Sequence, residues 1–268
     1  MARSVKKHTI ATVYGHDISP EAMALATESG AIDAPLTRET LQECDLLLIA
    51  IAPRSLVKWV EDHADAIPTT TILVDLCGVK RYIYKHIAPI AREKGFLYVG
   101  GHPMAGTQYS GYKYARSNLF HNAPMVIVPP SFDAIALLSR VKDLLAPAGF
   151  GKISVTTAEK HDEMIGFVSQ LTHAIAVALM TCNDIEGLEK YTGDSFRDLT
   201  RIAKINDEMW SELFLANREA LLEQMDQFAA QFALMRQQLA EGDREGMREV
   251  MRRSTVRRKA LEKHDERK

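Results

Sequence analysis

The feature that most constrains the fold is an alternation of short apolar runs with helical segments. Asp45–Ala52 is apolar after its first residue, and similar runs occupy Thr71–Asp75, Phe96–Val99 and Met125–Val128. Continuous apolar runs of this length are typical of parallel strands that are buried on both faces. Because helical patterns separate these runs, the sequence predicts a doubly wound, parallel α/β sheet.

Turn and capping signals complete the expected order of elements. Ser19 and Gly30 are placed to cap a helix that has Pro20 at its first position. We expect strands at Thr9–Gly15 and Lys152–Thr156. We expect helices over Pro20–Ser29, Ser55–Ala64 and Phe132–Leu145, and a further helix that follows Lys80 and ends at Lys94.

From Thr157 onward the strand pattern gives way to helices. The run Ala158–Ile185 is largely apolar, and a three-four rhythm of apolar residues continues from Asp207 to Leu239, with a shorter helix at Arg244–Leu261. One helix of roughly 33 residues would be about 50 Å long. We therefore expect its apolar stripe to pack against a second subunit. The predicted domains are a sheet domain at 1–157 and an all-α dimerisation domain at 158–268.

Composition narrows the classes of function. The formal net charge of −2 gives no reason to expect a nucleic acid or an anionic membrane as partner. Cys44, Cys77 and Cys182 are too scattered for a disulfide framework or a metal cluster and fit a reducing cytoplasm. We expect no run long enough to span a bilayer and no metal site, and we expect a cytoplasmic protein.

A glycine-rich stretch at Gly100–Gly111 carries the strongest candidate for chemistry, His102. We expect the strand Phe96–Val99 to end in a glycine-rich turn that holds this histidine, stiffened by Pro103. Ligands of open α/β sheets lie at the carboxyl ends of strands, and histidine exchanges protons near neutral pH. The alternative is a loop histidine that caps a helix.

A Rossmann-like domain should open with a strand and a Gly-x-Gly-x-x-Gly loop, and an acidic residue should follow its second strand. Asp17 has the position of that acidic residue, which favours NAD, although an aspartate there also forms turns. The first strand and the loop are absent from the sequence, so the predicted domain is N-terminally incomplete. We favour truncation over loss of the cofactor site.

The chain resembles the prephenate dehydrogenase family of tyrosine biosynthesis, which includes arogenate dehydrogenases. The resemblance covers nearly the whole chain. It rests on an ordered set of motifs: Val13–Asp17, Val74–Lys80, His102–Thr107, His161-Asp162, Val168–His173, Phe196–Ala203 and Met209-Trp210.

The resemblance implies oxidation of a ring hydroxyl carbon by hydride transfer to NAD, with loss of the ring carboxylate as CO2. His102 is then the base, and Arg201 holds a substrate carboxylate. It places further substrate-binding residues at Gly78, Thr107, Gln108, His161, Ser169 and His173. It places the cofactor-binding residues at Asp17, Ile51, Ala52, Pro53 and Cys77.

Several of these residues also have plain structural explanations. Arg201 has the surroundings of a surface ion pair, and His161 is placed to cap a helix start. Ser169 and His173 are four residues apart and fit a hydrogen-bonded core pair. Trp210 is expected in the core.

Two departures from the family pattern bear on activity. Gly78 stands where the family commonly has a serine that orients substrate and catalytic histidine, and Gln108 stands where it often has glutamate. Prephenate and arogenate therefore both remain candidate substrates. A non-catalytic dimer that binds an aromatic metabolite but not the dinucleotide is the second hypothesis. A different hydroxyacid dehydrogenase, which would use a lysine from the helical domain, is the third.

Overall fold

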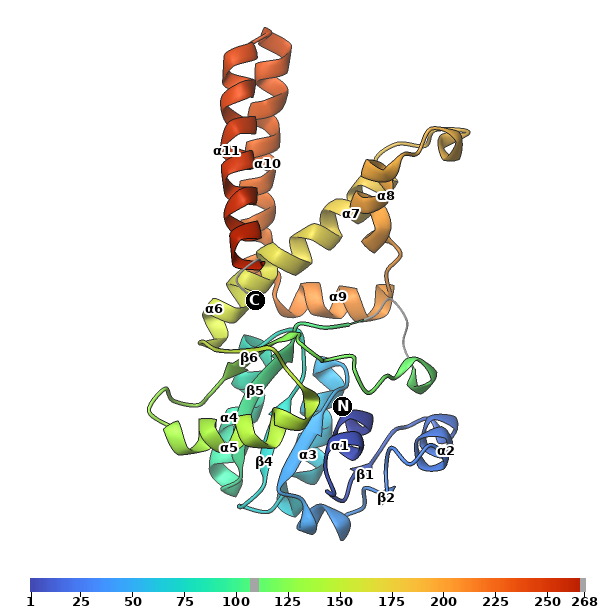
Figure 1. The fold of residues 1–268 in the computed structure, drawn as a ribbon. Coiled ribbons are helices and arrows are strands. Elements are labelled where there is room, and N and C mark those ends of the chain that lie inside the picture. The colour runs from blue at the N-terminus through green and yellow to red at the C-terminus, as the bar shows by residue number, and fades with distance from the viewer. Residues whose placement is uncertain (107–110, 266–268) are drawn as a thin grey trace. The chain divides into compact units, whose positions relative to one another are not determined.

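The computed structural model describes residues 1–106 and 111–265 (Figure 1). The chain forms two compact units, Met1–Ala220 and Leu221–Lys268, and each is described here by itself. The predicted residues Thr107 and Gln108 lie outside the described residues.

A five-stranded sheet forms the centre of the first unit in the described part of the chain, with strand order β3-β4-β5-β6-β7. Its strands are β3 (Leu46–Ile49), β4 (Ile72–Asp75), β5 (Leu97–Pro103), β6 (Pro124–Val128) and β7 (Lys152–Val155). The pairs are parallel except β5–β6, which is antiparallel. The predicted doubly wound α/β fold is confirmed, with this one pair as the exception to an all-parallel sheet.

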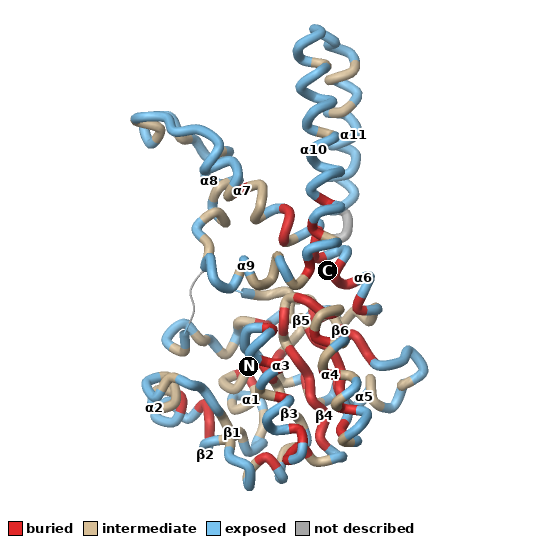
Figure 2. The backbone as a smooth tube through the Cα atoms, turned by 180° about the vertical axis from the view of Figure 1, so that it is seen from behind, coloured by how far each residue is buried: buried red, intermediate tan, exposed pale blue. Residues whose placement is uncertain are grey.

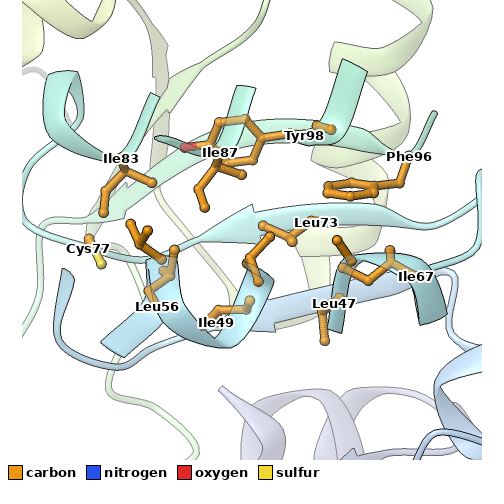
Figure 3. Close-up of a cluster of buried hydrophobic side chains, with 14 of the residues drawn as sticks. Leu47, Ile49, Leu56, Ile67, Leu73, Cys77, Ile83, Ile87, Phe96 and Tyr98 are labelled. Carbon is orange, nitrogen blue, oxygen red and sulfur yellow. The ribbon is translucent and has the colours of Figure 1, made fainter. Parts of the chain in front are cut away.

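Helices cover both faces of the sheet (Figure 1). On one face α3 (Pro53–His63) and α4 (Arg81–Lys94) bury residues such as Leu56 and Ile83 against side chains of the sheet (Figure 3). On the other face α5 (Ile135–Leu145) packs with Val141 and Leu145. Alternate residues of β4 supply the two cores: Leu73 faces the first, and Ile72 and Val74 face the second.

The N-terminal segment forms smaller elements. After α1 (Ala2–His8), the strand β1 (Tyr14–Gly15) pairs in parallel with β2 (Ala34–Pro35), and in the described residues this pair is a sheet of its own. β1 is much shorter than the predicted strand Thr9–Gly15. Helix α2 (Pro20–Glu28) begins where expected, because the Ser19 side chain accepts a hydrogen bond from the Ala22 amide, and Gly30 follows with φ of +66°.

The largest difference from expectation concerns β5, which does not end at Val99. It continues through Gly100 and Gly101 to Pro103, so His102 stands on a strand, opposite Val126 of β6. A Cβ atom on Gly101 would lie 2.8 Å from the Asp75 carbonyl oxygen and 2.8 Å from Val74 Cγ1. The glycine therefore permits close strand packing and does not form a turn.

The apolar run after Thr157 is helical but not regular. It consists of α6 (Ala158–Ile165), a π-helical turn (Gly166–Leu171) and α7 (Thr172–Thr181). By length and composition alone, Ala158–Thr181 could cross a membrane, so the expectation that no run is long enough was wrong. His161 and Asp162 of this run are buried against the sheet part of the same unit.

The single long helix predicted from Asp207 to Leu239 is two helices. After α8 (Asp194–Thr200) come α9 (Asp207–Ala216) and α10 (Arg218–Glu241), separated at Asn217. Asn217 is fully buried. Its side-chain amide donates to the carbonyl oxygen of Asp162 in α6 and to the side-chain oxygen of Gln170 in the π-helical turn. These tertiary bonds fix the break, although the apolar rhythm continues across it.

The second unit is a helical hairpin made of the rest of α10 and α11 (Arg244–Asp265), which run side by side (Figures 1 and 2). Gly242, with φ of +69°, lies in the turn between them. Large apolar side chains are exposed along both helices: Leu222, Met225, Phe228, Phe232, Leu234, Met235, Leu239, Met251, Val256 and Leu261.

The close packing at Gly101 gives a stability prediction. Gly101→Ala should lower the free energy of unfolding by about 1–3 kcal/mol, because the added methyl group meets backbone and a branched side chain. Denaturant unfolding measures the change. Gly193→Ala is the matched control, since a Cβ there meets nothing within 4 Å. Equal stability of the Gly101 variant and the wild type would contradict the account of this strand.

Candidate active site

Two histidines meet where β5 extends past the end of β4. The last pair between these strands is Asp75–Gly100, and His102 stands two residues further along β5. Its Nδ1 lies 2.9 Å from Nε2 of His161, a buried residue of α6. His161 does not cap the helix start, because the Thr157 side chain accepts the capping bond from the Lys160 amide.

Asp162 joins this pair to the start of α4. Its Oδ1 lies 2.7 Å from His161 Nδ1 and accepts the Lys80 amide at 2.7 Å, while Oδ2 accepts the Arg81 amide at 2.9 Å. The side chain of Asn217 donates to the Asp162 carbonyl oxygen at 2.9 Å. Asp162 is fully buried, so all of these bonds form away from water.

Lys80 and Asp75 form a buried ion pair close to the two histidines. Lys80 and Asp75 are both fully buried and in direct contact, and Lys80 Nζ also donates to the Cys77 carbonyl oxygen at 2.9 Å. The second carboxylate oxygen of Asp75 accepts the Tyr98 hydroxyl at 2.9 Å. A buried charge pair persists when additional hydrogen bonds satisfy its polar atoms, as they do here.

Burial and charge keep the histidine pair neutral. The pKa of His102 is held well below its ordinary value of 6.5, first by burial, then by His161 and by the Lys80 ammonium. Burial also lowers the pKa of His161, although hydrogen bonding to Asp162 acts in the opposite direction. A neutral imidazole can accept a proton, so His102 is suited to act as a base at neutral pH.

A second group of predicted residues gathers around α7. His173 Nδ1 donates to the Ser169 carbonyl oxygen at 2.9 Å, and its ring stacks on Trp210 with centroids 3.8 Å apart. Burial lowers the pKa of His173, and the nearby Arg201 adds to that effect. The turn that Arg201 begins (Arg201–Ala203) packs against α7, and the Arg201 side chain is exposed. Trp210, expected in the core, is only half-buried.

Gly78 lies beside the catalytic candidate. A Cβ atom built on it would be 3.9 Å from His102 Cε1 and 3.5 Å from Leu213 Cδ2. The structure therefore brings Gly78 and His102 together, with no side chain at position 78 to bond the ring.

The predicted cofactor residues lie at the carboxyl ends of β1, β3 and β4. Ile51 and Ala52 are exposed at the start of α3, and the Cys77 thiol donates to the Ile51 carbonyl oxygen at 3.3 Å. Burial raises the pKa of Cys77 to about 12, so the thiol stays protonated. Pro53 is the first residue of α3 and is buried.

Asp17 follows β1 and is exposed. Its Oδ1 accepts the Ser19 amide at 2.8 Å, so the turn-forming role is observed, while Oδ2 is available to a ribose hydroxyl. Exposed backbone at strand ends together with this carboxylate fits a dinucleotide.

Sequence reasoning missed several residues that connect the site. Asp162 was named only as part of the motif His161-Asp162 and was given no role. At Asn217 no glycine or proline indicates that the helix breaks. The Glu212 carboxylate of α9 accepts the Arg54 amide at 2.7 Å, at the start of α3. The π-helical turn before His173 also had no signal, and such turns are frequent at functional sites.

Comparisons with known proteins agree with this arrangement. Residues 1–154 match the family model of the prephenate dehydrogenase nucleotide-binding domain, and residues 157–253 match that of the prephenate dehydrogenase dimerization domain. The chain is 28% identical over 232 residues to cyclohexadienyl dehydrogenase of Zymomonas mobilis, covering 84% of this chain and 78% of that protein.

Two further relatives extend the likeness. Prephenate dehydrogenase of Bacillus subtilis is 26% identical over 256 residues, covering 92% of this chain and 68% of that protein. Among solved structures, prephenate dehydrogenase from A. aeolicus in complex with hydroxyphenyl propionate and NAD+ superposes with a TM-score of 0.87 and is 26% identical in sequence. That match covers 97% of this chain and 93% of the other.

Proposed function

The chain belongs to the prephenate dehydrogenase family, and we propose that it oxidises prephenate to 4-hydroxyphenylpyruvate and CO2 with NAD. The observation that carries the proposal is the neutral His102 on β5, bonded to His161 beside Gly78. Removal of a hydroxyl proton requires an unprotonated base. His102 also lies at an edge of the sheet where ligands of α/β proteins bind. NAD, when bound, supplies the hydride acceptor.

His102 takes the proton of the ring hydroxyl as that carbon is oxidised. Because its Nδ1 faces His161, Nε2 is the nitrogen left for the substrate. When the ring carboxylate leaves as CO2, the ring becomes aromatic and its oxygen becomes a phenolate. The proton held by His102 returns to that oxygen, so the histidine ends the cycle neutral.

We assign substrate binding to the group around α7. Arg201 binds a substrate carboxylate, since its planar guanidinium offers two parallel donors. Nε2 of His173 is available to substrate, because its Nδ1 is used by the Ser169 carbonyl oxygen. Gly78 leaves room for substrate beside His102. Thr107 and Gln108 are proposed from sequence alone.

We assign the cofactor to the strand ends that carry Asp17, Ile51, Ala52, Pro53 and Cys77. Asp17 would bond a ribose 2′-hydroxyl, which favours NAD over its 2′-phosphorylated form. The protonated Cys77 thiol, bonded to the Ile51 carbonyl oxygen, holds the two loops together.

We further propose a cytoplasmic homodimer whose C-terminal helices form the interface. The exposed apolar side chains of α10 and α11 support this, together with the match to a dimerization-domain model. We propose that the boundary between the sheet domain and the helical domain lies after residue 157, close to where the two family models meet.

The direct test is formation of reduced nicotinamide by the purified chain, given NAD with prephenate or with arogenate. Turnover with prephenate supports the proposal. Turnover with arogenate alone would reassign the substrate while keeping the reaction class. Absence of turnover with either compound would contradict the proposal, and absence of NAD binding as well would favour the non-catalytic dimer.

His102→Asn should lower kcat by about 10²–10⁴-fold, the usual effect of losing a general base, while the Kd for NAD stays unchanged. Steady-state kinetics and a binding titration measure the two quantities. The control is His121→Asn, an exposed histidine outside the site. An unchanged kcat in the His102 variant would remove it as the base.

Arg201→Ala should act mainly on substrate affinity. Loss of a charge-assisted hydrogen bond of about 1.5–3 kcal/mol raises KM for prephenate by about 10- to 100-fold. Arg197→Ala is a control from the same motif, since Arg197 is exposed and pairs with Asp194. If both variants have the same KM as the wild type, Arg201 does not bind the substrate.

A further inference from the structure

We propose that His161 and Asp162 are positioning residues that fix the single ring proton of His102 on Nδ1 and leave its Nε2 unprotonated. The inference rests on the proposed function and adds to it the groups that prepare the base. It starts from the carboxylate of Asp162 and proceeds outward, one hydrogen bond at a time.

The Asp162 carboxylate is an acceptor surrounded by donors. The Lys80 amide donates to Oδ1 and the Arg81 amide donates to Oδ2, so both oxygens act as acceptors. The charged Arg81 side chain adds to this environment, with Nε 3.7 Å from Oδ2. A carboxylate accepts and cannot donate. The 2.7 Å contact with His161 therefore requires that His161 Nδ1 carries a proton.

The state of His161 then determines the state of His102. His161 is buried and its pKa is lowered, so its ring is neutral and carries one proton, the one on Nδ1. Its Nε2 is consequently a lone pair. That lone pair faces His102 Nδ1 at 2.9 Å, so His102 must donate from Nδ1. In a neutral His102 this leaves Nε2 as the only basic nitrogen.

Nothing else in the described part of the site provides this control. Gly78, beside the ring, has no side chain, and the positive charge of Lys80 is committed to Asp75 and the Cys77 carbonyl oxygen. Without His161 the His102 ring would divide its proton between two nitrogens. Molecules with the proton on Nε2 would be unable to accept the substrate proton there.

His161→Gln and His161→Leu separate this role from others. The glutamine amide can donate to Asp162 and accept from His102, as the imidazole does, but it cannot take up a proton. We expect His161→Gln to keep kcat within about tenfold of the wild type, and His161→Leu to lower it by about 10²-fold or more, with the Kd for NAD unchanged in both. His121→Leu serves as the matched control on an exposed histidine.

A readout without turnover makes the inference independent of the reaction. Long-range ¹H–¹⁵N spectra of the histidine rings report which nitrogen carries the proton, and His102 is assigned from the spectrum of the His102→Asn variant. The wild type and His161→Gln should show His102 protonated on Nδ1, and His161→Leu should show a mixture.

Protonation of His102 on Nε2 in the wild type would overturn the inference even if the leucine variant fails to fold. Loss of activity in His161→Gln equal to that in His161→Leu would also overturn it, because titration of His161 would then be needed. If the wild type turns over neither prephenate nor arogenate, the proposed function fails, while the ring spectra still decide the tautomer.

Discussion

The site depends on one buried carboxylate placed at the start of a helix. Asp162 comes from α6, and its oxygens accept the backbone amides of Lys80 and Arg81, where α4 begins. The first amides of a helix have no partners within the helix, and a negative charge there is favoured by the helix dipole. One interaction therefore caps α4, fixes α6 against the sheet part of the unit and holds His161.

Helix α9 makes further contacts within the first unit. Trp210 stacks on His173, Glu212 accepts an amide at the start of α3, and Leu213 packs near Gly78. Asn217, at the end of α9, bonds the Asp162 carbonyl oxygen and the Gln170 side chain. Residues of α9 and its C-cap thus contact the start of α3, Gly78, His173 and Asp162.

The sequence predicted much of the fold because burial leaves a local signature. Apolar runs identified β3, β4 and β6, and Ser19 and Pro20 marked the start of α2. The extension of β5 was missed because Gly100 and Gly101 indicate turns when read locally, whereas here Gly101 admits the close approach of Asp75 and Val74. The break at Asn217 and the π-helical turn were missed because both depend on tertiary bonds that no periodicity records.

The site was predicted unevenly for the same reason. His102, Gly78, Ser169 and His173 were expected in the site; in the structure His102 lies beside Gly78, and His173 bonds to Ser169. Asp162 was not singled out, because its importance comes from lying at the start of α4, about eighty residues away along the chain. Residue type and spacing cannot show such a contact.

The central claim is that this network keeps His102 neutral and ready to accept a proton. The most direct test is an NMR titration of the His102 ring in the wild-type protein. The account predicts a pKa well below 6.5, so that His102 is unprotonated across the neutral range and loses its capacity as a base only as the pH falls through that value. A midpoint at or above 6.5 would show that burial, His161 and Lys80 do not control the ring, and would contradict the account.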